Sequence, residues 1–212
     1  MKHLILAAAG AVSMLALGSC ATMSEDQCLA GAWGEQGYAD GRSGLLASRL
    51  EDHASACAKF DVVPNSRAYF SAREDGLREY CTPVRGFQVG REGSTYAGVC
   101  PSQLEVGFLP AYQDGQMVYA AEQAVSSARS RVESFGARAE HLDEKIIAKQ
   151  AELRAEGLTD AERDQIRERI GEIRHERGDV IREWRRAQDE VDDAEHRARD
   201  VRYHFADLYG RW

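Results

Sequence analysis

The C-terminal half of the chain carries two heptad stripes, and these constrain the fold more than any other feature. Small or apolar residues recur there in alternating steps of three and four, which is typical of a coiled-coil seam. The first stripe is Val118, Ala121, Val125, Ala128, Val132, Phe135, Ala139, Leu142, Ile146, Lys149 and Leu153; the second is Ile166, Ile170, Ile173, Arg177, Val180, Trp184, Ala187, Val191, Ala194, Ala198, Val201, Phe205 and Leu208. Gly157 lies between them. We therefore predict a mainly α fold in which residues 102–212 form an antiparallel helical hairpin, with helices over 102–156 and 160–209.

The register of this hairpin follows from folding the chain back near Thr159. It sets valines opposite alanines, so large and small side chains interlock. It also pairs opposite charges beside the seam, although Glu122 and Glu195 would meet as like charges. The expected ion pairs are Arg131–Glu190, Arg138–Glu183, Lys145–Glu176, Glu152–Arg169 and Asp143–Arg174. The alternative, one helix that dimerises with another molecule, would have to continue through Gly157. Capping boxes are expected at Ser102 and Thr159, each with a glutamate three residues later.

The N-terminus has the pattern of an exported protein. A short positive segment precedes an apolar run over residues 4–17, too short for a membrane span of about 20 residues. We predict a signal peptide over residues 1–19. The sequence Leu17-Gly18-Ser19-Cys20 resembles the lipobox of bacterial lipoproteins, and this resemblance implies that Cys20 becomes an acylated N-terminus. An ordinary secretory signal with an incidental cysteine is the alternative.

Localisation and partners are expected to follow from this anchor. Ala21 is not the aspartate that retains enteric lipoproteins in the inner membrane, which favours the outer membrane, facing the periplasm. The net charge of −8 and the pI of about 5.3 argue against nucleic acid and against electrostatic binding to anionic lipid. The expected attachment to the membrane is therefore through acylated Cys20.

Four further cysteines lie within a predicted helical module over residues 20–101. In an oxidising compartment an even number of cysteines indicates disulfides. Among three connectivities we favour Cys28–Cys57 and Cys81–Cys100, because each closes a local loop around one helical segment. Such a loop stabilises by roughly 3–4 kcal/mol on the chain-entropy model. The cysteines form no C-x-x-C pair and no histidine lies at ligand spacing, so no metal or cofactor is predicted.

A weak internal repeat runs through the same module. Residues 37–41, 72–76 and 111–115 each end in Asp-Gly, and residues 86–90 are a more distant copy. One interpretation is that carboxylates and aromatic rings line a ligand groove. The other is that small residues four apart let short helices pack backbone to backbone. The candidate ligand or packing positions are Trp33, Tyr38, Asp40, Asp75, Tyr80, Tyr112 and Asp114.

The local structure of the module is expected to be helical. Candidate helices cover residues 30–41, 43–60 and 66–80. The glycines over residues 86–98 suggest turns or a short helix broken by loops, and a β-hairpin over 87–99 is less favoured because the apolar alternation is poor.

An ordered series of aromatic residues, glycines and cysteines resembles the uncharacterised family of bacterial envelope proteins called domain of unknown function 2799. The match spans residues 28–119, and the resemblance implies a lipoprotein with a helical tail but no activity. The residues that carry it are Trp33, Gly37, Tyr38, Asp40, Gly41, Gly44, His53, Cys57, Tyr69, Gly76, Leu77, Tyr80, Cys81, Phe87, Gly90, Gly93, Tyr96, Gly98, Cys100 and Pro101.

Catalysis is not expected. A Cys57–His53 nucleophile pair would need a free thiol, and a packing histidine beside a disulfide is the simpler interpretation. The chain lacks a nucleophile elbow, a phosphate loop and a dinucleotide fingerprint. His141, His175, His196 and His204 are too far apart for a metal cluster.

We expect an interaction or scaffolding role, with the hairpin contacting an unknown envelope protein or a second copy. A cell-wall or small-ligand binding module is the alternative, and a hydrolase using His53 with a carboxylate is the third. The aromatic run Tyr203, Phe205, Tyr209 and Trp212 is expected to pack beside residues 108–112, or else to form a docking patch.

Overall fold

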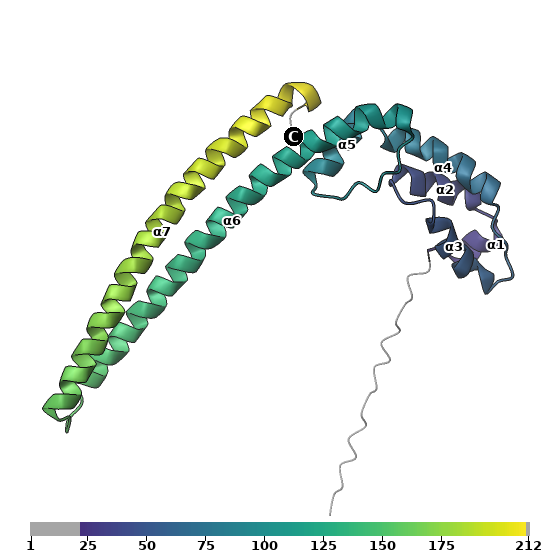
Figure 1. Ribbon diagram of the computed structural model, residues 1–212. Coiled ribbons are helices and arrows are strands. Elements are labelled where there is room, and N and C mark those ends of the chain that lie inside the picture. Colours follow the sequence, from purple (N-terminus) through teal and green to yellow (C-terminus); the bar gives the residue numbers. More distant parts are fainter. Residues whose placement is uncertain (1–21, 211–212) are drawn as a thin grey trace, which may run out of the picture. The chain divides into compact units, whose positions relative to one another are not determined.

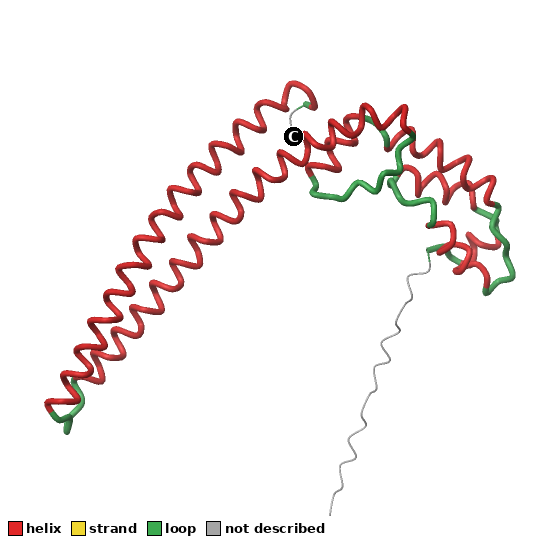
Figure 2. The backbone as a smooth tube through the Cα atoms, viewed as in Figure 1, coloured by secondary structure: helices red, strands yellow, loops and turns green. Residues whose placement is uncertain are grey.

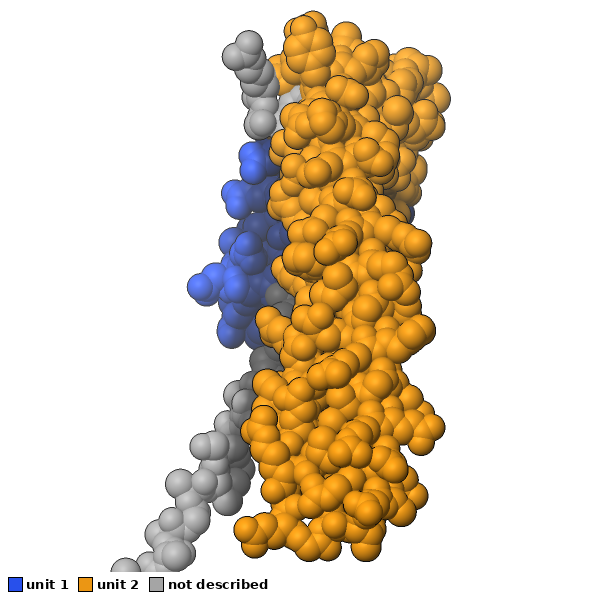
Figure 3. All heavy atoms as spheres, turned by 90° about the vertical axis from the view of Figure 1, so that its left-hand side faces the viewer, with its two compact units in different colours: residues 1–77 blue, residues 78–212 orange. Residues whose placement is uncertain are grey.

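The computed structural model describes residues 22–210, and every regular element among them is a helix (Figures 1 and 2). The predicted mainly α fold is confirmed. The expected signal peptide and Cys20 lie outside the described residues. The chain divides into two compact units, residues 1–77 and 78–212, within helix α4 (Figure 3). The helices are α1 (Glu25–Leu29), α2 (Trp33–Arg42), α3 (Arg49–Ala58), α4 (Ser66–Tyr80), α5 (Pro83–Arg91), α6 (Ser102–Leu153) and α7 (Asp160–Tyr209).

Among residues 22–210, no helix combines the length and the apolar composition needed to span a bilayer.

Unit 1 is organised around a disulfide and a small core. Ser24 and Gln27 form a capping box that begins α1, and the predicted Cys28–Cys57 disulfide is present. The core cluster consists of Met23, Cys28, Trp33, Leu50, Cys57 and Tyr69.

Helices α2 and α4 pack with their backbones in contact. A Cβ atom added to Gly37 would lie 2.1 Å from the carbonyl oxygen of Tyr69, and one on Gly41 would lie 2.2 Å from that of Arg73. From the other side, a Cβ on Gly76 would lie 2.2 Å from the carbonyl oxygen of Tyr38. Only glycine fits at such separations, so these three positions serve close helix packing, as the second interpretation of the repeat predicted.

Unit 2 contains the same contact between α5 and α6. Cβ atoms on Gly86 and Gly90 would lie 2.5 Å and 2.0 Å from the carbonyl oxygens of Phe108 and Tyr112. One on Gly115 would lie 2.2 Å from that of Phe87. The spacings along both helices equal those in the α2–α4 pair, so the weak sequence repeat corresponds to a repeated helix–helix contact.

Residues 83–91 form helix α5, so the β-hairpin considered for this region is excluded. Thr82 caps the helix, accepting a hydrogen bond from the backbone N–H of Arg85, and Pro83 occupies its first turn. The predicted Cys81–Cys100 disulfide ties the segment before α5 to the start of α6.

The predicted hairpin is confirmed, because α6 and α7, of 52 and 50 residues, run side by side (Figure 1). Both heptad stripes are buried or half-buried, except Leu208, which is 64% exposed. α6 ends at Leu153, three residues earlier than expected, and Gly157 adopts a positive φ in the turn. The end nearest the turn has the larger core side chains: Leu142, Ile146, Ile173 and Val180.

Of the two expected capping boxes, one is present. Thr159 and Glu162 cap α7 reciprocally. At α6, Pro101 occupies the N-cap position, and Glu105 instead accepts a hydrogen bond from the hydroxyl of Tyr96 at 2.8 Å.

The charged pairs beside the seam differ from expectation in detail. Arg131–Glu190 forms as predicted. The partners expected for Arg138 and Asp143 were wrong, since Arg138 reaches Glu176 and Asp143 binds Arg177. Three residues expected to pair across the seam pair within their own helix instead: Glu183 with Arg186, Arg169 with Glu172, and Glu152 with Lys149. The expected Lys145–Glu176 pair gives way to Arg138–Glu176.

The like charges Glu122 and Glu195 are each matched by an arginine, Arg202 and Arg129 respectively. An exposed arginine side chain is long enough to reach a carboxylate on any of several neighbouring helical turns at small cost in free energy. The register therefore predicts that opposite charges pair across the seam better than it predicts which two residues pair.

Candidate functional site

The most polar buried feature of the described chain is a hydrogen-bonded network in unit 1. His53 Nε2, on α3, lies 2.7 Å from Asp40 Oδ2, on α2, and the hydroxyl of Tyr69, on α4, donates to the same oxygen at 2.6 Å. The other ring nitrogen, Nδ1 of His53, lies 2.7 Å from Oγ1 of Thr22. Asp40, His53 and Tyr69 are 3%, 1% and 0% exposed, whereas Thr22 is half-buried. Side chains from α3 and α4 thus both bind the Asp40 carboxylate on α2.

The Asp40 carboxylate is well supplied with donors. Gln36 Nε2 donates to its second oxygen, Oδ1, at 2.9 Å. Because a carboxylate only accepts, His53 Nε2 donates to it, and the opposite edge of the ring meets the Thr22 hydroxyl. Burial, followed by the hydrogen bond to Asp40, raises the pKa of Tyr69, so its hydroxyl remains a donor even at a pH where a free tyrosine ionises. A buried charge that is bonded this fully fixes the geometry around it.

Comparison of the two glycine-mediated helix pairs shows that close helix packing does not require this polar network. In the α5–α6 pair, Val89 stands at the position of Asp40 and Phe108 at that of Tyr69, counted from the glycines. Both are buried, at 3% and 0% exposure. The glycine contact therefore forms equally well with an apolar interior. What the polar version adds is a hydrogen bond to Thr22.

Two catalytic interpretations can be compared with this geometry. Cys57 is disulfide-bonded, which removes the cysteine–histidine nucleophile pair. Thr22, His53 and Asp40 do follow the hydroxyl–imidazole–carboxylate order of nucleophilic hydrolases. However, the ring and the carboxylate are sealed from solvent, and Tyr69 shares the carboxylate oxygen. This arrangement is suited to holding the Thr22 segment in place.

No group of three or more His, Cys, Asp or Glu residues within the described part of the chain could hold a metal ion.

The three Asp-Gly carboxylates have separate environments. Asp40 belongs to the buried network, and Asp75 is exposed on α4. Asp114 accepts a hydrogen bond from the hydroxyl of Tyr209 at 2.7 Å.

The aromatic candidates are packed against protein. Trp33, 2% exposed, lies in the core of unit 1, and the ring of Tyr80 stacks on Phe108 at 5.2 Å. The hydroxyl of Tyr112 donates to the carbonyl of Ser94 at 3.1 Å, which fastens the loop before α6. Tyr38 is half-buried on α2. Packing therefore accounts for most of these positions.

The C-terminal rings pack on the second unit's own core. Tyr209 stacks on Phe87 at 4.1 Å between ring centroids, and Phe205 joins the cluster of Phe87 and Val118. Burial and the hydrogen bond to Asp114 raise the pKa of Tyr209 to about 12. The packing expectation is confirmed for these two rings, whereas Tyr203 is 81% exposed and Trp212 lies outside the described residues.

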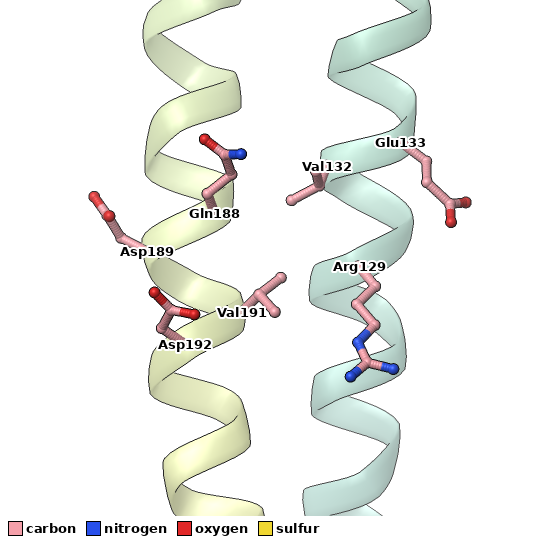
Figure 4. A pocket seen from close by; sticks show the side chains of 7 residues that line it. All are labelled: Arg129, Val132, Glu133, Gln188, Asp189, Val191 and Asp192. Atoms are coloured by element: carbon pink, nitrogen blue, oxygen red, sulfur yellow. The ribbon is translucent and has the colours of Figure 1, made fainter.

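A groove of about 620 Å³ opens along the seam of the hairpin. Figure 4 shows Val132 of α6 and Val191 of α7 pointing toward one another across it. The buried seam residues on either side, such as Ala128 and Ala194, are small, so the helices leave surface uncovered here. Its other lining residues are polar or charged: Arg129, Glu133, Gln188, Asp189 and Asp192.

α6 also presents an exposed face that the sequence analysis missed. Seven uncharged residues follow one another at steps of four and three, the same heptad spacing as the seam with α7 but on another side of the helix. All are exposed, including Val106 at 76% and Met117 at 55%. We call them the outer stripe: Val106, Pro110, Gln113, Met117, Ala120, Ala124 and Ser127. The spacing was readable in the sequence, but its exposure was not.

Each unit of the described chain thus contains one disulfide and one glycine-mediated helix pair, and the second pair continues into the long hairpin. Residues 32–117 match the family model described as protein of unknown function DUF2799. The predicted resemblance is confirmed over that range, which contains both glycine-mediated helix contacts. No curated protein and no solved structure matches the chain.

Proposed function

We propose that this protein is a lipid-anchored envelope protein on the periplasmic face of the outer membrane, with an interaction or scaffolding role for its hairpin. The lipobox-like segment ending at Cys20 supports the anchor, and the disulfides fit an oxidising compartment.

The outer stripe is the observation that carries the interaction role. It extends over 22 residues, from Val106 to Ser127, which is about 32 Å at a rise of 1.5 Å per residue, on a chain in which 29% of residues are charged. The hairpin forms through the buried side chains of its own α6–α7 seam, so this face is not needed for it. Uncharged side chains at heptad spacing fit another helix, because knobs from a partner helix require that repeat. The partner is a helix of a second copy or of another envelope protein.

Site-specific photo-cross-linking in intact cells tests this role. Benzoylphenylalanine in place of Met117 is expected to give a discrete cross-linked species, whose mass and peptides distinguish a second copy from another protein. The matched control places the same residue at Ser126, which is exposed on α6 and lies about 180° around the helix from Met117.

Charge on the stripe provides a second measurement. Ala124→Glu should reduce the Met117 cross-link several-fold while circular dichroism remains unchanged, because a charge cannot be buried in the contact without cost. Ser126→Glu should leave the cross-link intact. Equal cross-linking from both positions, or insensitivity to Ala124→Glu, would refute the stripe as the contact.

A further inference from the structure

The first residues that the structure describes lie next to the predicted lipid anchor in the sequence. The Thr22 hydroxyl is hydrogen-bonded to buried His53, the next residue, Met23, is 1% exposed, and Ser24 caps α1. Each of these three consecutive residues is thus fixed to unit 1, through the network, the core and the helix cap respectively. Thr22, Met23 and Ser24 are therefore already held within the fold of unit 1.

The distance from Thr22 to Cys20 is limited by covalent geometry alone. Only Ala21 separates them in the sequence, and two successive Cα–Cα steps span about 7 Å at most, whatever the conformation. A flexible spacer of the kind that would let a folded domain move freely above a bilayer needs many more residues.

We propose that unit 1 lies directly on the lipid headgroups, with the face that carries Thr22 toward the bilayer, and that the Thr22–His53–Asp40–Tyr69 network is the clamp that keeps it there. This inference rests on the proposed acylation of Cys20. It gives the network a role that has no counterpart in the α5–α6 pair. That pair makes the same glycine contact, but Val89 and Phe108 occupy the positions of Asp40 and Tyr69. The partner surface is the lipid bilayer.

The test uses the full-length lipidated protein in vesicles of phosphatidylethanolamine and phosphatidylglycerol that carry a nitroxide on the headgroup. A bimane fluorophore is attached at Asp52→Cys, next to His53 on α3; Asp52 is exposed and its ion pair with Arg49 contributes little. The four cysteines in the described part of the chain are in disulfides, so the added thiol can be labelled selectively. The comparison protein carries ten Gly/Ser residues inserted between Ala21 and Thr22, which adds a root-mean-square reach of about 17 Å.

The headgroup nitroxide should quench the bimane at least twofold more in the uninterrupted chain than in the chain with the insertion. Equal quenching of the two proteins, whether strong or weak, would overturn the short-tether placement. Mass spectrometry of the N-terminal peptide separates this failure from failure of the proposed function. An unacylated Cys20 would overturn both, whereas an acylated Cys20 with equal quenching would overturn only the placement of unit 1.

Discussion

Gly37 faces the main chain of Tyr69 so closely that a single added carbon would lie 2.1 Å from the tyrosine's carbonyl oxygen. Gly86 and Phe108 stand in the same relationship in the second unit. Two helix pairs with the same backbone contact thus differ in their interiors, one polar and one apolar. The close packing of these helix pairs therefore does not require the His53 network.

Gly37→Ala should lower the free energy of unfolding of unit 1 by about 2 kcal/mol or more, because α2 and α4 must move apart to admit the methyl group. Gly34→Ala is the matched control on the same helix, since its Cβ would meet only the Cβ of Ala72, at 4.0 Å. That change should be neutral or stabilise by about 0.5–1 kcal/mol through helix propensity. Urea denaturation followed by circular dichroism measures both, and equal effects would contradict the close contact.

Tyr69→Phe should destabilise unit 1 by about 1–3 kcal/mol, because the buried Asp40 carboxylate loses a donor while the ring is kept. Tyr80→Phe is the comparison, since Tyr80 packs by stacking on Phe108 and should tolerate the change within about 0.5 kcal/mol. The expectation fails if the two variants have the same midpoint in urea.

Acid should weaken the hairpin. Hydrogen bonds from Thr159 to Glu162, from Arg138 to Glu176 and from Arg129 to Glu195 lower the pKa values of these carboxyl groups. A carboxyl whose pKa is lower in the folded state contributes stability above its unfolded pKa of about 4.3, and this is lost as the pH falls through the folded value. The melting temperature should therefore be steady near neutral pH and decline below about pH 4.5. The decline should shrink in 1 M salt, which screens exposed pairs.

Alkali should also destabilise the chain, by the opposite route. The pKa of Tyr209 is raised to about 12 and that of Tyr69 is raised as well. A group with a raised pKa contributes stability that is complete below its unfolded value of about 10 and is lost as the pH rises through the folded value. Burial also raises the pKa values of Tyr80 and Tyr96. Phenolate absorbance at 295 nm should therefore show four tyrosines that ionise late, and Tyr209→Phe should remove one of them. Simultaneous titration of all tyrosines near pH 10 would contradict this.

Several features follow from local sequence and were predictable. The hairpin is one, because a heptad repeat is a short-range pattern and both seams repeat it many times. The Thr159 cap needs only four consecutive residues. The disulfides were readable because each closes a loop between nearby segments, with separations of 29 and 19 residues.

In the helix over residues 83–91, tertiary packing overrides the low helix propensity of the local sequence. Gly86 and Gly90 are poor helix formers on their own, which favoured turns in the sequence analysis. In the structure the same glycines allow α5 to lie against α6, and that packing stabilises the helix.

The sequence by itself determined that the chain is helical, where its hairpin turns and which positions close the seam, and it favoured the disulfide pairing that the structure shows. Only the tertiary structure decided that Thr22, Asp40, His53 and Tyr69 meet, because three helices must first pack before side chains up to 31 positions apart come within hydrogen-bond distance. It likewise decided which heptad face of α6 is covered by α7 and which is left exposed. The spacing of residues in the sequence shows which of them share a face of a helix, whereas the burial of that face depends on which other helix packs against it.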